Sequence, residues 1–116
     1  METHKLKVYN RARLLSEQIV KSTGKVPRFA KYSYVDPMIV SVYGIMEYIS
    51  FANDTPEQRV QFIDTALAAL NQLKIKVRVL RDLKFVTQKG YDAIIREEEN
   101  VTRQLNGWRK TTLGEQ

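Results

Sequence analysis

Apolar residues recur at intervals of three and four positions through most of the chain, which is the spacing of amphipathic helices. The stretch from residue 70 to residue 85 shows the pattern most clearly. Leu70, Leu73, Val77 and Leu80 fall on one helical face there, and five cations against one acid are interleaved with them. A helix that is apolar on one side and cationic along its flank is typical of a bundle that binds a partner.

The same spacing predicts four helices with short connections between them. No strand alternation, internal repeat or low-complexity segment is visible. We therefore expect an all-α protein, folded over residues 1–116 as a single antiparallel up-down four-helix bundle. The expected helices cover about residues 4–23, 36–52, 56–85 and 87–110.

Proline and capping residues set the expected helix boundaries. Residues 25–34 are expected to form a short basic connector, after which Asp36 caps the second helix and Pro37 occupies its first turn. Thr55 and Gln58 are spaced as a capping box for the third helix.

The second predicted helix is apolar on nearly every side. Glu47 is its only charged residue between Met38 and Asn53. Such a helix lies either at the centre of a core or against another subunit, and no helix of a four-helix domain is fully surrounded by the other three. Self-association is therefore expected, with a partner protein as the alternative occupant of the surface. The expected interface residues are Val40, Tyr43, Tyr48, Phe51, Ile75 and Val79.

The net charge of +6 and the pI near 9.7 favour a polyanionic partner, which is nucleic acid, anionic membrane or an acidic protein. A merely basic, solvated surface is the alternative. Residues 1–35 carry eight Lys or Arg against two acids, and residues 74–89 carry six against one. In an up-down bundle these two segments meet at one end. The expected nucleic-acid-binding residues at that end are Arg28, Lys31, Arg81 and Lys84, extended by Lys74 and Arg78.

Residues suited to catalysis are scarce, and we expect neither an enzyme nor a cofactor or metal. The chain has no Cys, and its only histidine, His4, has no metal-ligand spacing around it. Glu98 falls on the apolar side of the last helix, where burial against an arginine is the expected role. Four tyrosines have two alternatives, stacking on bases or forming the rim of the core: Tyr9, Tyr32, Tyr34 and Tyr43.

The N-terminus is charged, and no apolar run approaches the roughly 20 residues that span a bilayer. A cytoplasmic protein without a membrane partner is therefore expected.

Several segments together resemble the family called "four helix bundle protein". KLKVYNRARLLSEQIVKSTGKVP is similar to its opening helix and Lys-x-Pro exit, and YISFANDTPEQR to its second-helix exit. ALAALNQLKIKVRVLRDLKFVTQKGYD is similar to its third helix and following turn, and LNGWRK to its closing motif. The family includes the accessory variability determinant (Avd) of diversity-generating retroelements.

A sister branch is encoded within intervening sequences of large-subunit ribosomal RNA genes and typically carries Arg-Arg-Ala and Asn-Ile-Ala-Glu-Gly in its second helix. This chain reads MIVSVYGIMEYISFAND there, so Avd is the better match. That resemblance implies a ring-like homopentamer of basic four-helix protomers. It also implies a non-enzymatic accessory protein that binds reverse transcriptase and RNA or DNA in mutagenic retrohoming, with Lys7 and Arg11 added to the nucleic-acid surface. The alternative is a scaffold or partner-docking bundle of the ribosomal RNA intervening-sequence type, with no direct nucleic-acid role.

Overall fold

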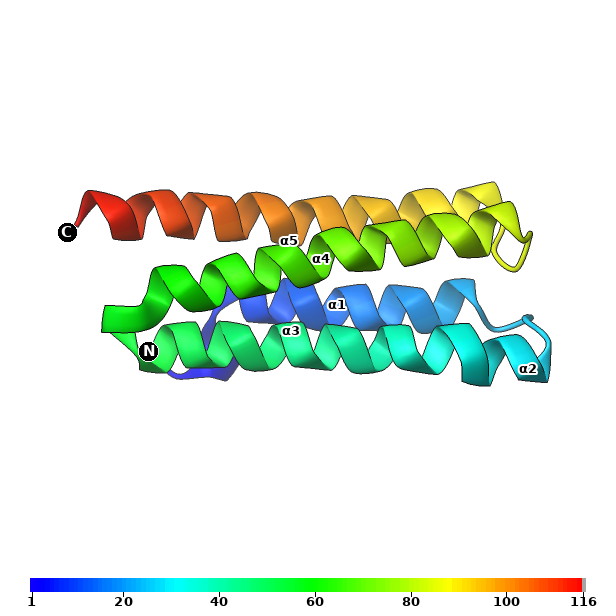
Figure 1. Cartoon of the computed structure of the whole chain (residues 1–116), viewed down its shortest axis with the longest axis horizontal. Helices are drawn as coiled ribbons and strands as arrows, with labels where there is room; N and C mark the ends of the chain where they lie inside the picture. The colour runs from blue at the N-terminus through cyan, green and yellow to red at the C-terminus, as the bar shows by residue number, and fades with distance from the viewer. Residues whose placement is uncertain (116) are drawn as a thin grey trace.

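The computed structural model describes residues 1–115, which form four long helices and four short helical turns (Figure 1). Within these residues there is no strand, so the all-α prediction is confirmed. Gln116, which the expected domain includes, lies outside the described residues. The long helices are α1 (Lys7–Ser22), α3 (Asp36–Asp54), α4 (Arg59–Asp82) and α5 (Gln88–Gly114). The short elements are η1 (Thr3–Lys5), α2 (Arg28–Ala30), η2 (Lys31–Val35) and η3 (Pro56–Gln58).

The four long helices lie side by side along a molecule of 48 × 20 × 19 Å (Figure 1). Helix α1 packs on α3 and α5, and α4 packs on the same two helices. The α1–α3 and α4–α5 connections lie at one end of the bundle, and the α3–α4 turn lies at the other (Figure 1). This arrangement is compatible with the expected up-down bundle. The ring-like homo-oligomer stays a prediction.

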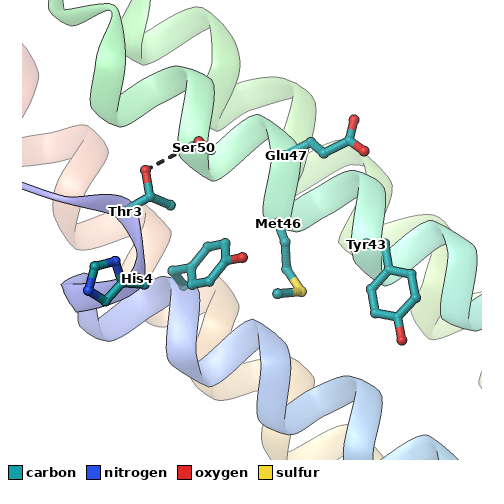
Figure 2. A pocket seen from close by; sticks show the side chains of 7 residues that line it. Thr3, His4, Tyr43, Met46, Glu47 and Ser50 are labelled. Atoms are coloured by element: carbon teal, nitrogen blue, oxygen red, sulfur yellow. Dashed lines mark hydrogen bonds between the residues drawn. The ribbon is translucent and has the colours of Figure 1, made fainter.

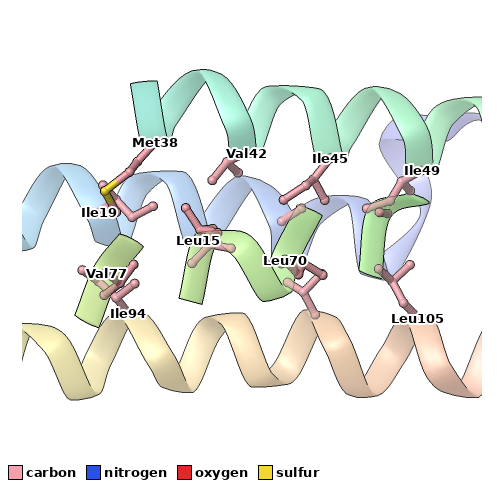
Figure 3. Close-up of a cluster of buried hydrophobic side chains, with 14 of the residues drawn as sticks. Leu15, Ile19, Met38, Val42, Ile45, Ile49, Leu70, Val77, Ile94 and Leu105 are labelled. Carbon is pink, nitrogen blue, oxygen red and sulfur yellow. The ribbon is translucent and has the colours of Figure 1, made fainter. Parts of the chain in front are cut away.

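One continuous apolar core runs between the four helices (Figure 3). Leu15, Ile45, Leu70, Ile94 and Leu105 are fully buried in it. Burying one large aliphatic side chain contributes about 1.5–3 kcal/mol, so this shared core is what holds the helices together. The helical face that the sequence assigns to the third helix is buried in full: Leu70, Leu73, Val77 and Leu80.

The expected basic connector is wrong, because the chain is helical from Arg28 onward and passes through the wide turn η2 directly into α3. Asp36 therefore lies inside a helix, in right-handed helical conformation, and its side chain caps nothing. The proline ring of Pro37 would clash with the carbonyl of Ser33 in a regular helix. The π-type turn η2 includes Ser33, so the irregularity stands where the proline requires it.

The expected capping box does not form, because neither Thr55 nor Gln58 makes a side-chain cap. Helix α4 begins instead at Arg59, whose guanidinium donates hydrogen bonds to the carbonyls of Ala52 (2.8 Å) and Asn53 (3.2 Å). These carbonyls lie in the last turn of α3, so Arg59 satisfies acceptors that the end of the helix leaves open.

Candidate nucleic-acid interface

Basic residues from distant parts of the sequence meet at the end of the bundle that holds the α1–α3 and α4–α5 connections (Figure 1). Arg28 and Lys31 lie in α2 and η2, while Arg81 and Lys84 lie at the end of α4 and in the connection after it. The structure therefore brings these four residues to one end, as the charge pattern predicts. Their role in nucleic-acid binding stays a prediction.

A groove of about 1070 Å³ opens at this end, between the exit of α1 and the α4–α5 connection. Five cations line it, and among the described residues its lining includes no carboxylate: Lys21, Lys25, Arg81, Lys84 and Lys89. Lys21, Lys25 and Lys89 are missing from the residues expected from the sequence. They belong to the two segments of highest charge, but only the folded connections show that they share one groove with Lys84.

The backbone at the end of α4 places Lys84 in the groove. Lys84 has a φ of 64°, in the left-handed region that favours glycine. Its N–H donates to the carbonyl of Arg81 and the N–H of Phe85 donates to the carbonyl of Leu80, each at 2.9 Å. These two bonds form a Schellman motif, which ends α4 at Asp82 rather than at the expected residue 85.

Arg81 is held by two neighbours beside the groove. Its guanidinium lies 4.4 Å from the centroid of the Tyr91 ring and contacts the Asp82 carboxylate at 3.2 Å. Arg81 is thus oriented within the protein, with its charge partly balanced by Asp82.

The other expected binding residues do not belong to this end cluster. Arg11 and Lys74 lie along the sides of the bundle and contact carboxylates of α5 at 3.7 Å, Glu97 and Glu99 respectively. Arg78 is exposed, and no carboxylate of residues 1–115 lies within 4 Å of it. Lys7 is exposed at the start of α1, which is the opposite end of the bundle.

Glu98 is buried between α4 and α5, with 4% of its surface exposed. Burial raises the pKa of its carboxyl, while a hydrogen bond from the Thr102 hydroxyl (3.1 Å) and the charge of Lys74 act in the opposite direction. The expected arginine partner is therefore wrong: Thr102 and Lys74 take that place.

The expected oligomer-interface residues are mostly exposed on α3 and α4. Their exposed fractions are 66% for Val40, 58% for Ile75, 53% for Tyr43, 46% for Phe51 and 41% for Val79. Tyr48, the sixth, is partly buried against the core instead. The single chain therefore leaves five of these six apolar side chains in contact with solvent.

The only histidine lies at a second groove, of about 520 Å³, between the N-terminal segment, α1 and α3 (Figure 2). His4 contacts Glu2 at 3.5 Å, and Figure 2 shows Glu47 on the far side of the groove. The hydroxyls of Thr3 and Ser50 are hydrogen-bonded at 3.2 Å, which fastens the N-terminal segment to α3. In the described part of the chain, no three acidic or histidine side chains are grouped to hold a metal ion.

No helix in residues 1–115 is both long and apolar enough to cross a bilayer.

Comparison with known proteins gives one family. No curated protein matches the sequence. The family model of the 23S rRNA-intervening sequence protein matches residues 4–107, and this is the branch that the sequence of the second helix disfavours. The match supports a helical family of the four-helix type and does not extend to Avd. Because it covers most of the sequence, the chain belongs to the 23S rRNA-intervening sequence protein family.

Proposed function

We propose that this protein is a non-enzymatic scaffold of the ribosomal RNA intervening-sequence type, which assembles with copies of itself and docks a polyanionic partner. The observation that carries the proposal is the row of exposed apolar side chains on α3 and α4, of which Val40 and Ile75 are the most exposed. Large exposed apolar patches on soluble proteins mark interaction sites. Its proposed location is the cytoplasm, in keeping with a sequence that has no cysteine.

A second copy of the chain is the proposed occupant of the apolar face. The helix that carries most of this face, α3, has a single charged residue, Glu47, between Asp36 and Asp54. An interface core is depleted in charged residues, so a second apolar face suits it better than the basic sides of the bundle. Two identical faces that meet about a two-fold axis close as a dimer, and the ring that the family resemblance implies would need this face to contact a different surface of the next copy.

Native mass spectrometry of the purified protein tests the assembly. The double variant Val40→Asp/Ile75→Asp is expected to dissociate the oligomer, because it places a charge at each of two apolar contacts. Val20→Asp is the matched control, since Val20 is 55% exposed but lies on α1. A wild-type protein that is monomeric at high concentration, or a double variant that assembles as the wild type does, would overturn the proposed assembly.

The second candidate function is the accessory role in a diversity-generating retroelement. There the protein would bind reverse transcriptase together with RNA or DNA and support mutagenic retrohoming. The lysine-lined groove at the end of the bundle favours it, because such a groove suits phosphate contacts. Co-purification with the reverse transcriptase tests this role. If Arg78→Glu/Arg81→Glu abolishes polymerase binding but leaves RNA binding intact, the basic surface docks a protein rather than nucleic acid.

A further inference from the structure

Two exposed aromatic side chains lie beside the cationic groove, and we call them the aromatic ledge: Phe29 and Tyr32. Phe29 is 61% exposed and Tyr32 is 58% exposed, although both lie in the helical segment that leads into α3. The Phe29 ring packs edge-on against Phe85, with centroids 5.7 Å apart, and Tyr34 lies on the same ring at 6.1 Å. Phe85 supports the ledge from below, since it packs against the core. Phe29 is therefore held against Phe85, while the rings of Phe29 and Tyr32 stay open to solvent.

The ledge and the groove share the α4–α5 connection. Phe85 and the adjacent Lys84 both line the groove, so the row of cations begins directly beside the aromatic rings. Lys31 lies on the ledge itself, with its ammonium 5.5 Å from the centroid of the Tyr32 ring. Aromatic rings and cations thus lie next to one another at this end of the bundle.

Lys84 is an independent sign that this surface is functional. Its left-handed backbone would be unstrained with glycine, which is the residue most often found at this position of a Schellman motif. A strained residue at the edge of a groove is an observed outlier of the kind that clusters at ligand sites. A lysine supplies charge there, which glycine cannot do.

We propose that this end of the bundle binds single-stranded nucleic acid, with bases stacked on Phe29 and Tyr32 and phosphates in the groove of Lys21, Lys25, Lys84 and Lys89. The proposal rests on the polyanion-docking function above and names its ligand. Aromatic rings that alternate with cations are typical of sites for single strands, because only an unpaired base offers a free face for stacking. A duplex could use the lysines but not the ledge, and an acidic protein would gain little from either exposed ring.

Fluorescence anisotropy with three probes tests the ligand class: labelled oligo(dT) of about 16 nucleotides, the corresponding duplex, and polyglutamate. The wild-type protein is expected to bind oligo(dT) at least tenfold more tightly than the duplex or polyglutamate. Equal affinity for duplex and single strand would overturn the inference but leave polyanion docking intact. Failure to bind any of the three probes at low salt would overturn polyanion docking as well.

Variants separate stacking from charge. Phe29→Leu and Tyr32→Leu are each expected to weaken oligo(dT) binding roughly tenfold, without changing the slope of log K against log salt. Lys84→Ala is expected to reduce that slope by about 0.7, because one phosphate contact is lost. Tyr32→Phe keeps the ring and is expected to bind as the wild type does.

Two matched controls lie away from the site. Leu113→Ala removes an exposed apolar side chain and Lys110→Ala removes an exposed charge, both near the end of α5 that lies opposite the groove. Both are expected to leave affinity and slope unchanged, with circular dichroism confirming that every variant is folded. Leucine variants of the ledge that bind as tightly as the wild type would refute stacking, whatever the lysines do.

Discussion

Replacing Lys84 by glycine tests whether the end of α4 stores the strain that its backbone indicates. The left-handed φ of 64° costs a residue with a Cβ about 1–2 kcal/mol, and glycine avoids that cost. Glycine also gives the unfolded chain more conformational freedom, which offsets the gain by about 0.5–1 kcal/mol. The two hydrogen bonds of the Schellman motif use backbone atoms and are retained. Lys84→Gly is therefore expected to raise the free energy of unfolding by about 0.5–1 kcal/mol.

Thermal unfolding followed by circular dichroism measures the effect. For a domain of this size the expected gain corresponds to a Tm increase of about 2–4 °C. The same change at Lys110, an exposed position inside α5, is expected to lower stability by about 1 kcal/mol, because glycine is a poor helix former. Lys84→Ala keeps the strain and is expected to gain nothing. A Tm that falls equally for Lys84→Gly and Lys110→Gly would refute the argument that position 84 is strained.

Three further outcomes are expected from the buried and helical positions. Burial raises the pKa of Glu98 above its ordinary value, so its contribution to stability is greatest below that ordinary pKa and is lost as pH rises through the raised one. Glu98→Gln is therefore expected to raise the urea midpoint at neutral pH more than at acidic pH, and an equal change at both would contradict this. Leu70→Ala, at a fully buried position, is expected to cost about 2–5 kcal/mol in urea denaturation, and a loss below that range would show that the core relaxes into the cavity. Gly107→Ala is expected to gain about 1 kcal/mol, because its added methyl meets no atom within 4 Å. Gly90→Ala should not share the gain, since its methyl would lie 2.9 Å from a methyl of Val86.

Hydrophobic spacing was sufficient to predict the long helices and their buried faces. Spacing alone predicts that Leu70 and Val77 lie in the core, and both are buried. Ile75 and Val79 are predicted to lie at an interface rather than in the core, and both are exposed in the single chain. The prediction agrees with the structure because a helix with one apolar stripe can bury that stripe in only one orientation.

Connections were harder to predict because tertiary packing decides them. Residues 28–35 carry two cations and no acid and precede Pro37, which favours a connector, yet Ala30 and Val35 are buried and hold the segment as a helix. Only the wide turn η2 reconciles that helix with the proline, and short motifs do not reveal such a turn. The left-handed backbone of Lys84 could not be predicted from the sequence either, because glycine is the usual signal for that conformation and this position is a lysine.

The charges at the end of the bundle differ in kind from those along its sides. Arg11 and Lys74 lie on helix sides and meet carboxylates of the neighbouring helix, so the fold itself accounts for them. Lys21 lies in the last turn of α1, where the helix dipole favours a cation. The helix dipole does not explain Lys89. This residue lies in the first turn of α5, where the dipole favours an acid, and that first turn has no acidic residue. Lys84 adds a strained backbone to the same groove. Two lysines that oppose local stability thus share one surface, and this supports the proposed ligand site, because residues that violate local structural rules are concentrated at functional sites.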